Sequence, residues 1–166
     1  MLVIFSHGKE SGPQGTKINY LSKVAQDLGW KTHSIDYRNC QDVNERVALL
    51  QSTIHQSSEN NIVLVGSSMG GYVATAVANN LATKGLFLMC PAFYLPNYPI
   101  QTFTPSTDNI TIVHGWNDTI VPFQSSVKFG QKHHVNLHLI DDNHRLIAAA
   151  DFLQATFRNF LLNTKL

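Results

Sequence analysis

The sequence is poor in charge and in long hydrophobic runs, and each shortage excludes classes of protein. Charged residues make up 14% of the 166 residues, and 12 basic side chains balance 11 acidic ones without forming a block of one sign. This balance gives no electrostatic footprint for nucleic acid or for an anionic membrane. No apolar run approaches the roughly 20 residues that a bilayer-spanning helix needs. We therefore expect neither nucleic acid nor a membrane as a partner.

Cysteine is scarce as well. The chain contains only Cys40 and Cys90, and their spacing is not that of a metal site. Two thiols in a chain of this size favour a reducing compartment, so the cytoplasm is the expected location. The first residues lack the basic and long apolar segments of a signal peptide. With 43% hydrophobic residues, the chain can bury one core, and we expect a single domain over residues 1–166.

Short apolar runs alternate with helical segments along the chain. The expected strands are 2–6, 31–36, 61–65, 85–90, 109–114 and 135–140, and the expected helices are 16–28, 42–58, 69–81, 123–131 and 145–162. Continuous apolar strands are typical of a sheet covered on both faces. The alternation predicts right-handed crossovers and a three-layer, doubly wound α/β fold with parallel strands.

One segment, 91–108, interrupts this alternation with four prolines and several aromatic residues. We expect a loop over the strand ends, which is either a long connection or a pocket wall. In the second case Phe93 and Tyr94, together with Tyr72 in the preceding helix, would line a substrate pocket.

The most informative motif is Gly66-Ser67-Ser68-Met69-Gly70, which follows the apolar run Ile62-Val63-Leu64-Val65. A G-x-S-x-G sequence between strand and helix predicts a sharp turn that exposes the Ser68 hydroxyl above the carboxyl end of a sheet. Side chains at Gly66 and Gly70 would collide across such a turn. A simple glycine turn between a core strand and a helix is the less favoured alternative, and partners elsewhere in the chain decide between the two.

Candidate partners follow later strands. In open α/β sheets, sites form beyond the carboxyl ends of the strands. A nucleophilic serine needs a base, and an imidazole base needs a carboxylate that fixes its tautomer. Ser68, Asp118 and His144 occur in the chain order Ser, acid, His, each in a loop after a strand. Asp108 precedes its strand and so lies at the wrong end of the sheet. We expect His7 and His114 to form hydrogen bonds that shape the loops at the carboxyl edge of the sheet, which we call the rim.

The oxyanion of an acyl-transfer reaction needs two preorganised donors. The N–H of Met69, at the start of the helix after Ser68, is the first candidate, and the N–H of Lys9 after the first strand is the second. His134 and His138 lie four apart without an H-E-x-x-H motif, so no metal is expected. The glycine-rich segment 8–15 lacks the phosphate-loop pattern, so no nucleotide or other cofactor is expected.

Together these motifs resemble the α/β-hydrolase superfamily, and over essentially the whole chain they are most similar to small, cap-less bacterial esterases of the UPF0227 (YqiA-like) kind. The matching residues are His7-Gly8, the stretch Gly66–Tyr72, His114–Pro122 and Asp141–His144. The resemblance implies a minimal form of the fold with about six parallel strands in the order 2-1-3-4-5-6 and no separate lid domain. The chain carries Lys9-Glu10 where family members usually have an apolar residue or glycine.

The motifs and the resemblance predict a serine hydrolase that cleaves small carboxylic esters or thioesters through a Ser68–His144–Asp118 triad and an acyl-enzyme. The expected partner is a small-molecule acyl substrate. An amidase or peptidase on the same site is an alternative, because leaving-group preference lies in pocket shape. A non-catalytic binding protein on the same fold is another. A flavodoxin-like binder would leave Asp118 and His144 without a reason.

Overall fold

Six parallel strands form one sheet in the order β2-β1-β3-β4-β5-β6 in the computed structural model, which describes residues 1–164. The strands are β1 (Leu2–Ser6), β2 (Lys31–Ser34), β3 (Ile62–Ser67), β4 (Gly85–Met89), β5 (Ile110–Gly115) and β6 (Asn136–Ile140). The helices are α1 (Thr16–Asp27), α2 (Val43–Gln56), α3 (Met69–Ala78), α4 (Phe123–His133) and α5 (Ala150–Thr164). The predicted fold class and strand order are confirmed. The end of the predicted domain, residues 165–166, lies outside the described part.

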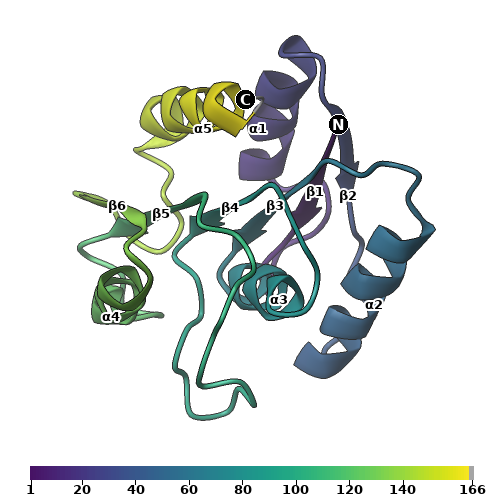
Figure 1. Ribbon diagram of the computed structural model, residues 1–166. Coiled ribbons are helices and arrows are strands. Elements are labelled where there is room, and N and C mark those ends of the chain that lie inside the picture. Colours follow the sequence, from purple (N-terminus) through teal and green to yellow (C-terminus); the bar gives the residue numbers. More distant parts are fainter. Residues whose placement is uncertain (165–166) are drawn as a thin grey trace.

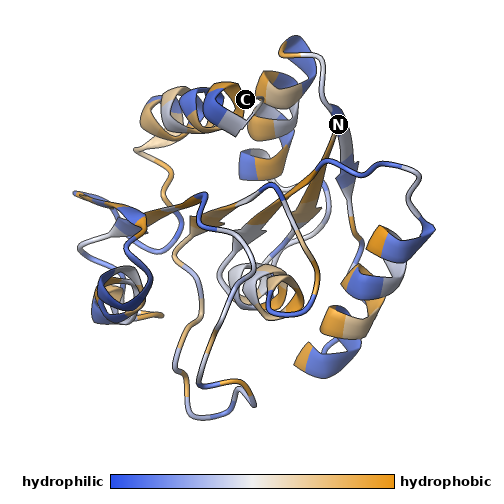
Figure 2. Cartoon of the chain, in the orientation of Figure 1, coloured by the Kyte–Doolittle hydropathy of each residue, from blue (hydrophilic) through white to orange (hydrophobic). Residues whose placement is uncertain are grey.

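The sheet is covered on both faces. Helices α1 and α5 lie on one face, and α2, α3 and α4 lie on the other (Figure 1). Alternate strand residues pack into two separate cores: Val3 and Phe5 contact the α1 and α5 side, whereas Ile4 contacts the opposite side. Hydrophobic residues are concentrated in the inner strands and in α3 (Figure 2). No helix among residues 1–164 is both long and apolar enough to cross a membrane.

The central strands position the site because they end together. All residues of β4 and β5 are buried, whereas β2 at the sheet edge alternates between exposed and half-buried residues. The parallel register pairs Ser6 with Gly66 and Gly115 with Ile140. The loops that carry the candidate residues therefore start from one edge of the sheet.

The last helix begins later than its sequence pattern predicts. The prediction starts at residue 145, but α5 begins at Ala150. Leu146 has a positive φ of 54°, which a helix does not allow. The Asp142 side chain accepts a hydrogen bond from the Ala149 amide at 2.9 Å and so holds the preceding turn. Tertiary contacts of the rim thus override the helical propensity of this apolar stretch.

The segment between β4 and β5 also differs from expectation. It starts at the carboxyl ends of the strands but then runs as an irregular chain beside α3, rather than over the strand ends (Figure 1). The Ile100 amide donates to the Tyr72 hydroxyl at 2.8 Å, and Ser106 donates to the carbonyl oxygen of Ala78 at the end of α3. The segment therefore takes the place of a crossover helix.

Candidate active site

Ser68 occupies a strained turn between β3 and α3. Its φ is 54° and its ψ is −120°, a conformation that residues with side chains adopt rarely and mainly at functional turns. A Cβ on Gly66 would lie 2.4 Å from the carbonyl oxygen of Gly70, and one on Gly70 would lie 1.9 Å from that of Ser6. Gly66 thus has the role that the motif predicts, whereas Gly70 allows α3 to approach β1.

The candidate oxyanion donors come from two different loops. A Cβ on Gly8 would lie 3.5 Å from the Cβ of Ser68, so the chain after β1 passes beside Ser68, and Lys9 is the next residue. Met69 is the first residue of α3, and an N–H at this position has no acceptor within its own helix. The side chains of Lys9 and Glu10 are exposed. The roles of these two amides stay predictions.

Buried side chains hold the loop after β1. The Tyr37 amide donates to His7 Nε2 at 3.0 Å, so His7 carries its proton on Nδ1 and donates it to the Gly8 carbonyl at 2.7 Å. Burial lowers the pKa of His7, which keeps the ring neutral. Arg46 of α2, fully buried, donates to the carbonyl oxygens of His7 at 3.1 Å and of Gly8 at 3.3 Å. The arginine therefore fixes the direction of the loop that passes Ser68.

The candidate base and acid are in direct contact. His144 Nδ1 lies 2.6 Å from Asp118 Oδ2. The Asp118 side chain has no exposed surface, whereas that of His144 is 20% exposed. Because a carboxylate oxygen only accepts, the proton is on Nδ1 of His144, and the lone pair of its Nε2 is free.

Several donors surround the Asp118 carboxylate. The amides of Ile120 and Val121 each donate to Oδ1 at 2.8 Å, and the two imidazoles of His144 and His114 donate to Oδ2. Burial on its own raises the pKa of Asp118, but hydrogen bonds from Val121, His144 and Ile120 outweigh it, and the pKa lies below its usual value. Asp118 is therefore ionised at neutral pH.

His114, at the end of β5, is a second imidazole on the same oxygen. Its Nε2 lies 3.0 Å from Asp118 Oδ2 and 3.0 Å from the Val121 carbonyl oxygen. Both atoms are acceptors, so Nε2 carries the proton and Nδ1 accepts from the Ser126 hydroxyl at 2.7 Å. Burial lowers the pKa of His114 and keeps it neutral. The hydrogen bonding expected of His114 is thus directed at the candidate acid itself.

Close contacts join the loop after β5, which carries Asp118, to the loop after β6, which carries His144. A Cβ on Gly115 would lie 2.3 Å from the Asp142 carbonyl oxygen, and the Asn117 amide donates to that oxygen at 3.0 Å. From α1, Lys17 donates to the carbonyl oxygen of Arg145, the residue after His144, at 2.9 Å. These contacts explain how His144 reaches Asp118.

Cys90 follows β4 and lies between the two halves of the site. It is fully buried, has a positive φ of 43°, and its amide donates to the Val113 carbonyl oxygen at 2.9 Å. Its sulfur lies within 4.8 Å of ligand atoms of Asp118 and His144, and burial raises the pKa of the thiol to about 12. Around it, the Ser68 amide donates to the Met89 carbonyl oxygen at 2.9 Å. The turn of Ser68 and the Asp118 side chain thus lie on either side of Cys90.

The aromatic pocket candidates lie apart from these contacts. Phe93 is fully buried and stacks on Phe129 with ring centroids 4.4 Å apart. Tyr72 is buried under the segment that follows β4, and the Tyr94 ring lies 4.2 Å below the Lys128 ammonium. Tyr72 and Phe93 therefore support the packing of this segment, and a contact of the three residues with substrate stays a prediction.

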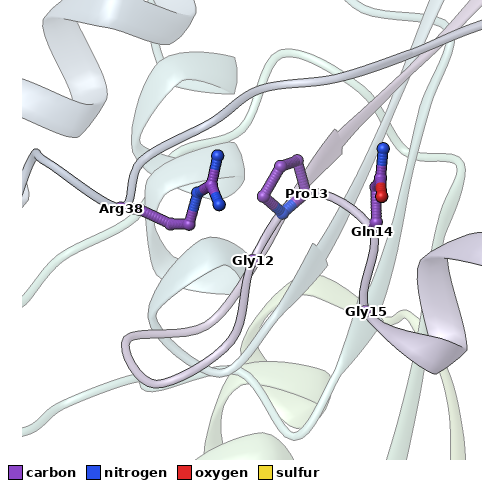
Figure 3. A pocket seen from close by; sticks show the side chains of 5 residues that line it. All are labelled: Gly12, Pro13, Gln14, Gly15 and Arg38. Atoms are coloured by element: carbon purple, nitrogen blue, oxygen red, sulfur yellow. The ribbon is translucent and has the colours of Figure 1, made fainter.

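A pocket of about 350 Å³ lies beside the loop that passes Ser68, lined by Gly12, Pro13, Gln14, Gly15 and Arg38 (Figure 3). The Arg38 guanidinium is already paired with the Asp36 carboxylate, with the closest N–O distance 2.6 Å. The pocket does not include the triad candidates. The pocket therefore lies next to the loop that follows β1, and its arginine already has an acidic partner.

Comparison with known proteins identifies the family of the chain. The model of the family described as "Uncharacterised protein family (UPF0227)" matches residues 2–109. A protein of the alpha/beta hydrolase superfamily from Xanthomonas campestris pv. campestris is 31% identical, with 98% of each chain covered and a TM-score of 0.90. The chain belongs to the UPF0227 family. Its similarity to this Xanthomonas protein also makes the chain a member of the α/β-hydrolase superfamily. The resemblance seen in the sequence is thereby confirmed.

More distant structures share the fold of this UPF0227 chain. Alpha/beta hydrolase domain-containing protein 10 from mouse is 19% identical, with 98% of this chain and 90% of that chain covered and a TM-score of 0.80. A lid-less a/b serine hydrolase from Xanthomonas campestris is 15% identical, with 98% and 81% covered and a TM-score of 0.79. No curated protein matches the chain. These likenesses show the fold.

The family match covers only part of the candidate site. Residues 2–109 include Ser68, Met69 and Lys9, but Asp118 and His144 lie beyond the matched segment. The pairing of these two residues therefore rests on the hydrogen bond in the structure.

Sequence reasoning missed two buried residues of the UPF0227 chain. Arg46 gave no signal, because an arginine in an amphipathic helix usually points to solvent. Cys90 follows an apolar strand and is typical of a core cysteine. Only the folded chain brings these two residues to the rim.

Proposed function

We propose that this UPF0227 chain is a serine hydrolase that cleaves small carboxylic esters or thioesters. The hydrogen bond from His144 Nδ1 to the buried Asp118 carboxylate supports this proposal most strongly. It fixes the imidazole tautomer that a general base needs. The strained turn of Ser68 opens onto the same edge of the sheet.

The proposed reaction proceeds in two halves. His144 Nε2 takes the proton of Ser68 Oγ as the oxygen attacks the carbonyl carbon, and the amides of Lys9 and Met69 hold the oxyanion. His144 then gives the proton to the departing alcohol or thiol. Water, deprotonated by His144 in turn, releases the acid from Ser68. The Ser68 hydroxyl has no hydrogen-bond partner among the described residues. We therefore propose that its hydrogen bond to His144 Nε2 forms when substrate binds. No cofactor takes part.

An active-site probe tests the nucleophile. Treatment with a fluorophosphonate, followed by peptide mass spectrometry, should label Ser68 in the wild-type protein. Ser68→Ala and His144→Ala should remain unlabelled. Labelling of the Ser68→Ala protein at full stoichiometry would show that another residue is the nucleophile. An unlabelled wild-type protein that is folded by circular dichroism would favour a non-catalytic binding protein on this fold.

The course of the chain suggests a preference for short acyl groups. Residues 91–108 run beside α3 (Figure 1), and Ser68 is partly exposed. A series of p-nitrophenyl esters should show kcat/KM falling as the acyl chain lengthens. The fastest turnover on the longest chain would contradict this preference. Matched anilides would reveal amidase activity, the alternative that uses the same residues.

The free state of both thiols favours the cytoplasm as the place of action.

A further inference from the structure

Cys90 has no task in the proposed reaction, although its thiol lies inside the candidate site. The residue is fully buried and holds a positive φ of 43°. Side chains kept in a sparsely populated conformation usually reflect a constraint from their surroundings. Here the Cys90 sulfur lies within 4.8 Å of ligand atoms of Asp118 and His144, which are themselves in contact at 2.6 Å.

The three side chains form a compact set of potential metal ligands. Ligand atoms of Cys90, Asp118 and His144 all lie within 4.8 Å of one another. A thiolate, an imidazole and a carboxylate are the donors that Zn²⁺ uses in proteins, and the sulfur selects soft ions over Mg²⁺ and Ca²⁺. A thiolate and a carboxylate would also neutralise the charge of a divalent ion.

We propose that Cys90, Asp118 and His144 form an inhibitory site for a soft divalent metal ion such as Zn²⁺. This inference rests on the proposed function, in which His144 is the base. The ion would bind Cys90 Sγ, Asp118 Oδ2 and His144 Nδ1, with water as a fourth ligand. The thiol proton leaves to solvent, and the Nδ1 proton of His144 is replaced by one on Nε2. No group is oxidised or reduced.

Inhibition follows from the tautomer. An imidazole that binds a metal through Nδ1 carries its proton on Nε2. The Nε2 of His144 then has no lone pair for the Ser68 proton, and the nucleophile is not activated. The metal would replace the proton that bridges His144 Nδ1 and Asp118 Oδ2. The same contact that orients the base would then keep it inactive.

The site can form with a small movement. Zinc bonds of about 2.0–2.3 Å require ligand atoms about 3.3–3.8 Å apart, so His144 must withdraw from its 2.6 Å contact with Asp118. His144 is the partly exposed member of the set, whereas Asp118 and Cys90 are buried. The ammonium of Lys17 lies near enough to interact with Cys90 and Asp118. It opposes a cation, so reversible inhibition is expected rather than a permanently filled site.

Zinc titration of ester hydrolysis tests the site. Zn²⁺ should inhibit wild-type hydrolysis of p-nitrophenyl acetate, EDTA should restore it, and Mg²⁺ at the same concentration should have no effect. In Cys90→Ser and Cys90→Ala, the inhibitory zinc concentration should rise more than about tenfold, because even changes behind a metal ligand cost 10–100-fold in affinity. Cys40→Ser is the matched control, since Cys40 is a free thiol beside the Glu45 carboxylate, and its sensitivity should equal that of wild type. Equal zinc sensitivity of both Cys90 variants and wild type would overturn the proposal.

Cobalt binding separates this inference from the proposed function. Co²⁺ should give a thiolate-to-cobalt charge-transfer band in the wild-type protein and in Cys40→Ser, a weaker one in His144→Ala, and none in either Cys90 variant. Such a band in a protein without hydrolase activity would sustain the metal site and remove the function. Hydrolysis and labelling of Ser68 without a Cys90-dependent band would sustain the function and remove the site.

Discussion

On the side of Ser68, the candidate site is built from close approaches of backbone; on the side of His144, it is built from side-chain hydrogen bonds. Gly66 and Gly70 allow contacts that any side chain would prevent. By contrast, Asp118 is held by His114, and the loop of His144 is held by Lys17 and Asp142.

The difference separates two kinds of specification. A close backbone approach has one chemical solution, glycine, and it leaves a short local motif. A hydrogen-bond network has many solutions, and its members come from distant parts of the chain. We therefore expect any added atom at the glycines beside Ser68 to disrupt the fold. Loss of a single hydrogen bond on the side of His144 should only reduce activity or stability in part.

The largest effect should follow a single added methyl group on the nucleophile side. In Gly70→Ala, the Cβ would lie 1.9 Å from the carbonyl oxygen of Ser6, so β1 and α3 must separate. We expect a loss of more than about 4 kcal/mol in the free energy of unfolding, measured by urea denaturation. The same change at Gly130 in α4 meets nothing closer than 3.6 Å and should be neutral or stabilise by up to about 1 kcal/mol. Equal stability of the two variants would refute the steric account.

The acid comes next. Asp118→Asn keeps the size of the side chain but removes the charge and allows the wrong tautomer of His144. We expect kcat for p-nitrophenyl acetate to fall about 10³–10⁴-fold. Asp141→Asn is the control, because Asp141 is exposed and bonds to Asn117 instead of His144. If both variants lost the same activity, Asp118 would have no special role.

His114 should act as a positioning residue with an intermediate effect. His114→Leu removes one donor to a charged group, which costs about 1.5–3 kcal/mol, so kcat should fall about 10–100-fold while KM changes little. His114→Gln, which can still donate, should recover part of the loss. A purely structural role predicts lower stability in both variants with kcat unchanged in the folded fraction. Steady-state kinetics beside thermal unfolding distinguishes the two.

The smallest effect is on stability against pH. Burial lowers the pKa values of His7 and His114 from 6.5 in the folded chain, so the unfolded chain binds protons first as the pH falls. Stability is therefore complete above about pH 6.5 and is lost below it, by up to about 1.4 kcal/mol per pH unit for each histidine. Urea unfolding between pH 7.5 and 5.5 should show a shallower slope for His114→Gln.

The same contrast explains what could be predicted from the sequence. The alternation of strands and helices and the turn at Ser68 follow from apolar runs and glycine spacing, which are local signals. The strand order followed from the resemblance to the α/β-hydrolase superfamily. The predicted start of α5 was five residues too early. The positive φ of Leu146 and the hydrogen bond of Asp142 to the Ala149 amide keep the preceding residues out of the helix.

Beyond the contact of Asp118 with His144, the network around Asp118 could not be predicted. Its members Cys90 and Ser126 are ordinary core residues by sequence, and their partners lie on other elements. The buried Arg46 satisfies its guanidinium with backbone carbonyl oxygens, so no complementary acidic residue marks it. Such roles depend on the register of neighbouring strands and helices.

Trapping the acyl-enzyme tests the central claim most directly. Wild-type protein mixed with p-nitrophenyl acetate should be quenched in acid within the first turnover and digested for mass spectrometry. The account predicts one acetyl group on the peptide that contains Ser68, and none in Ser68→Ala or His144→Ala. An acetyl group on a different residue, or undiminished turnover by Ser68→Ala, would contradict it.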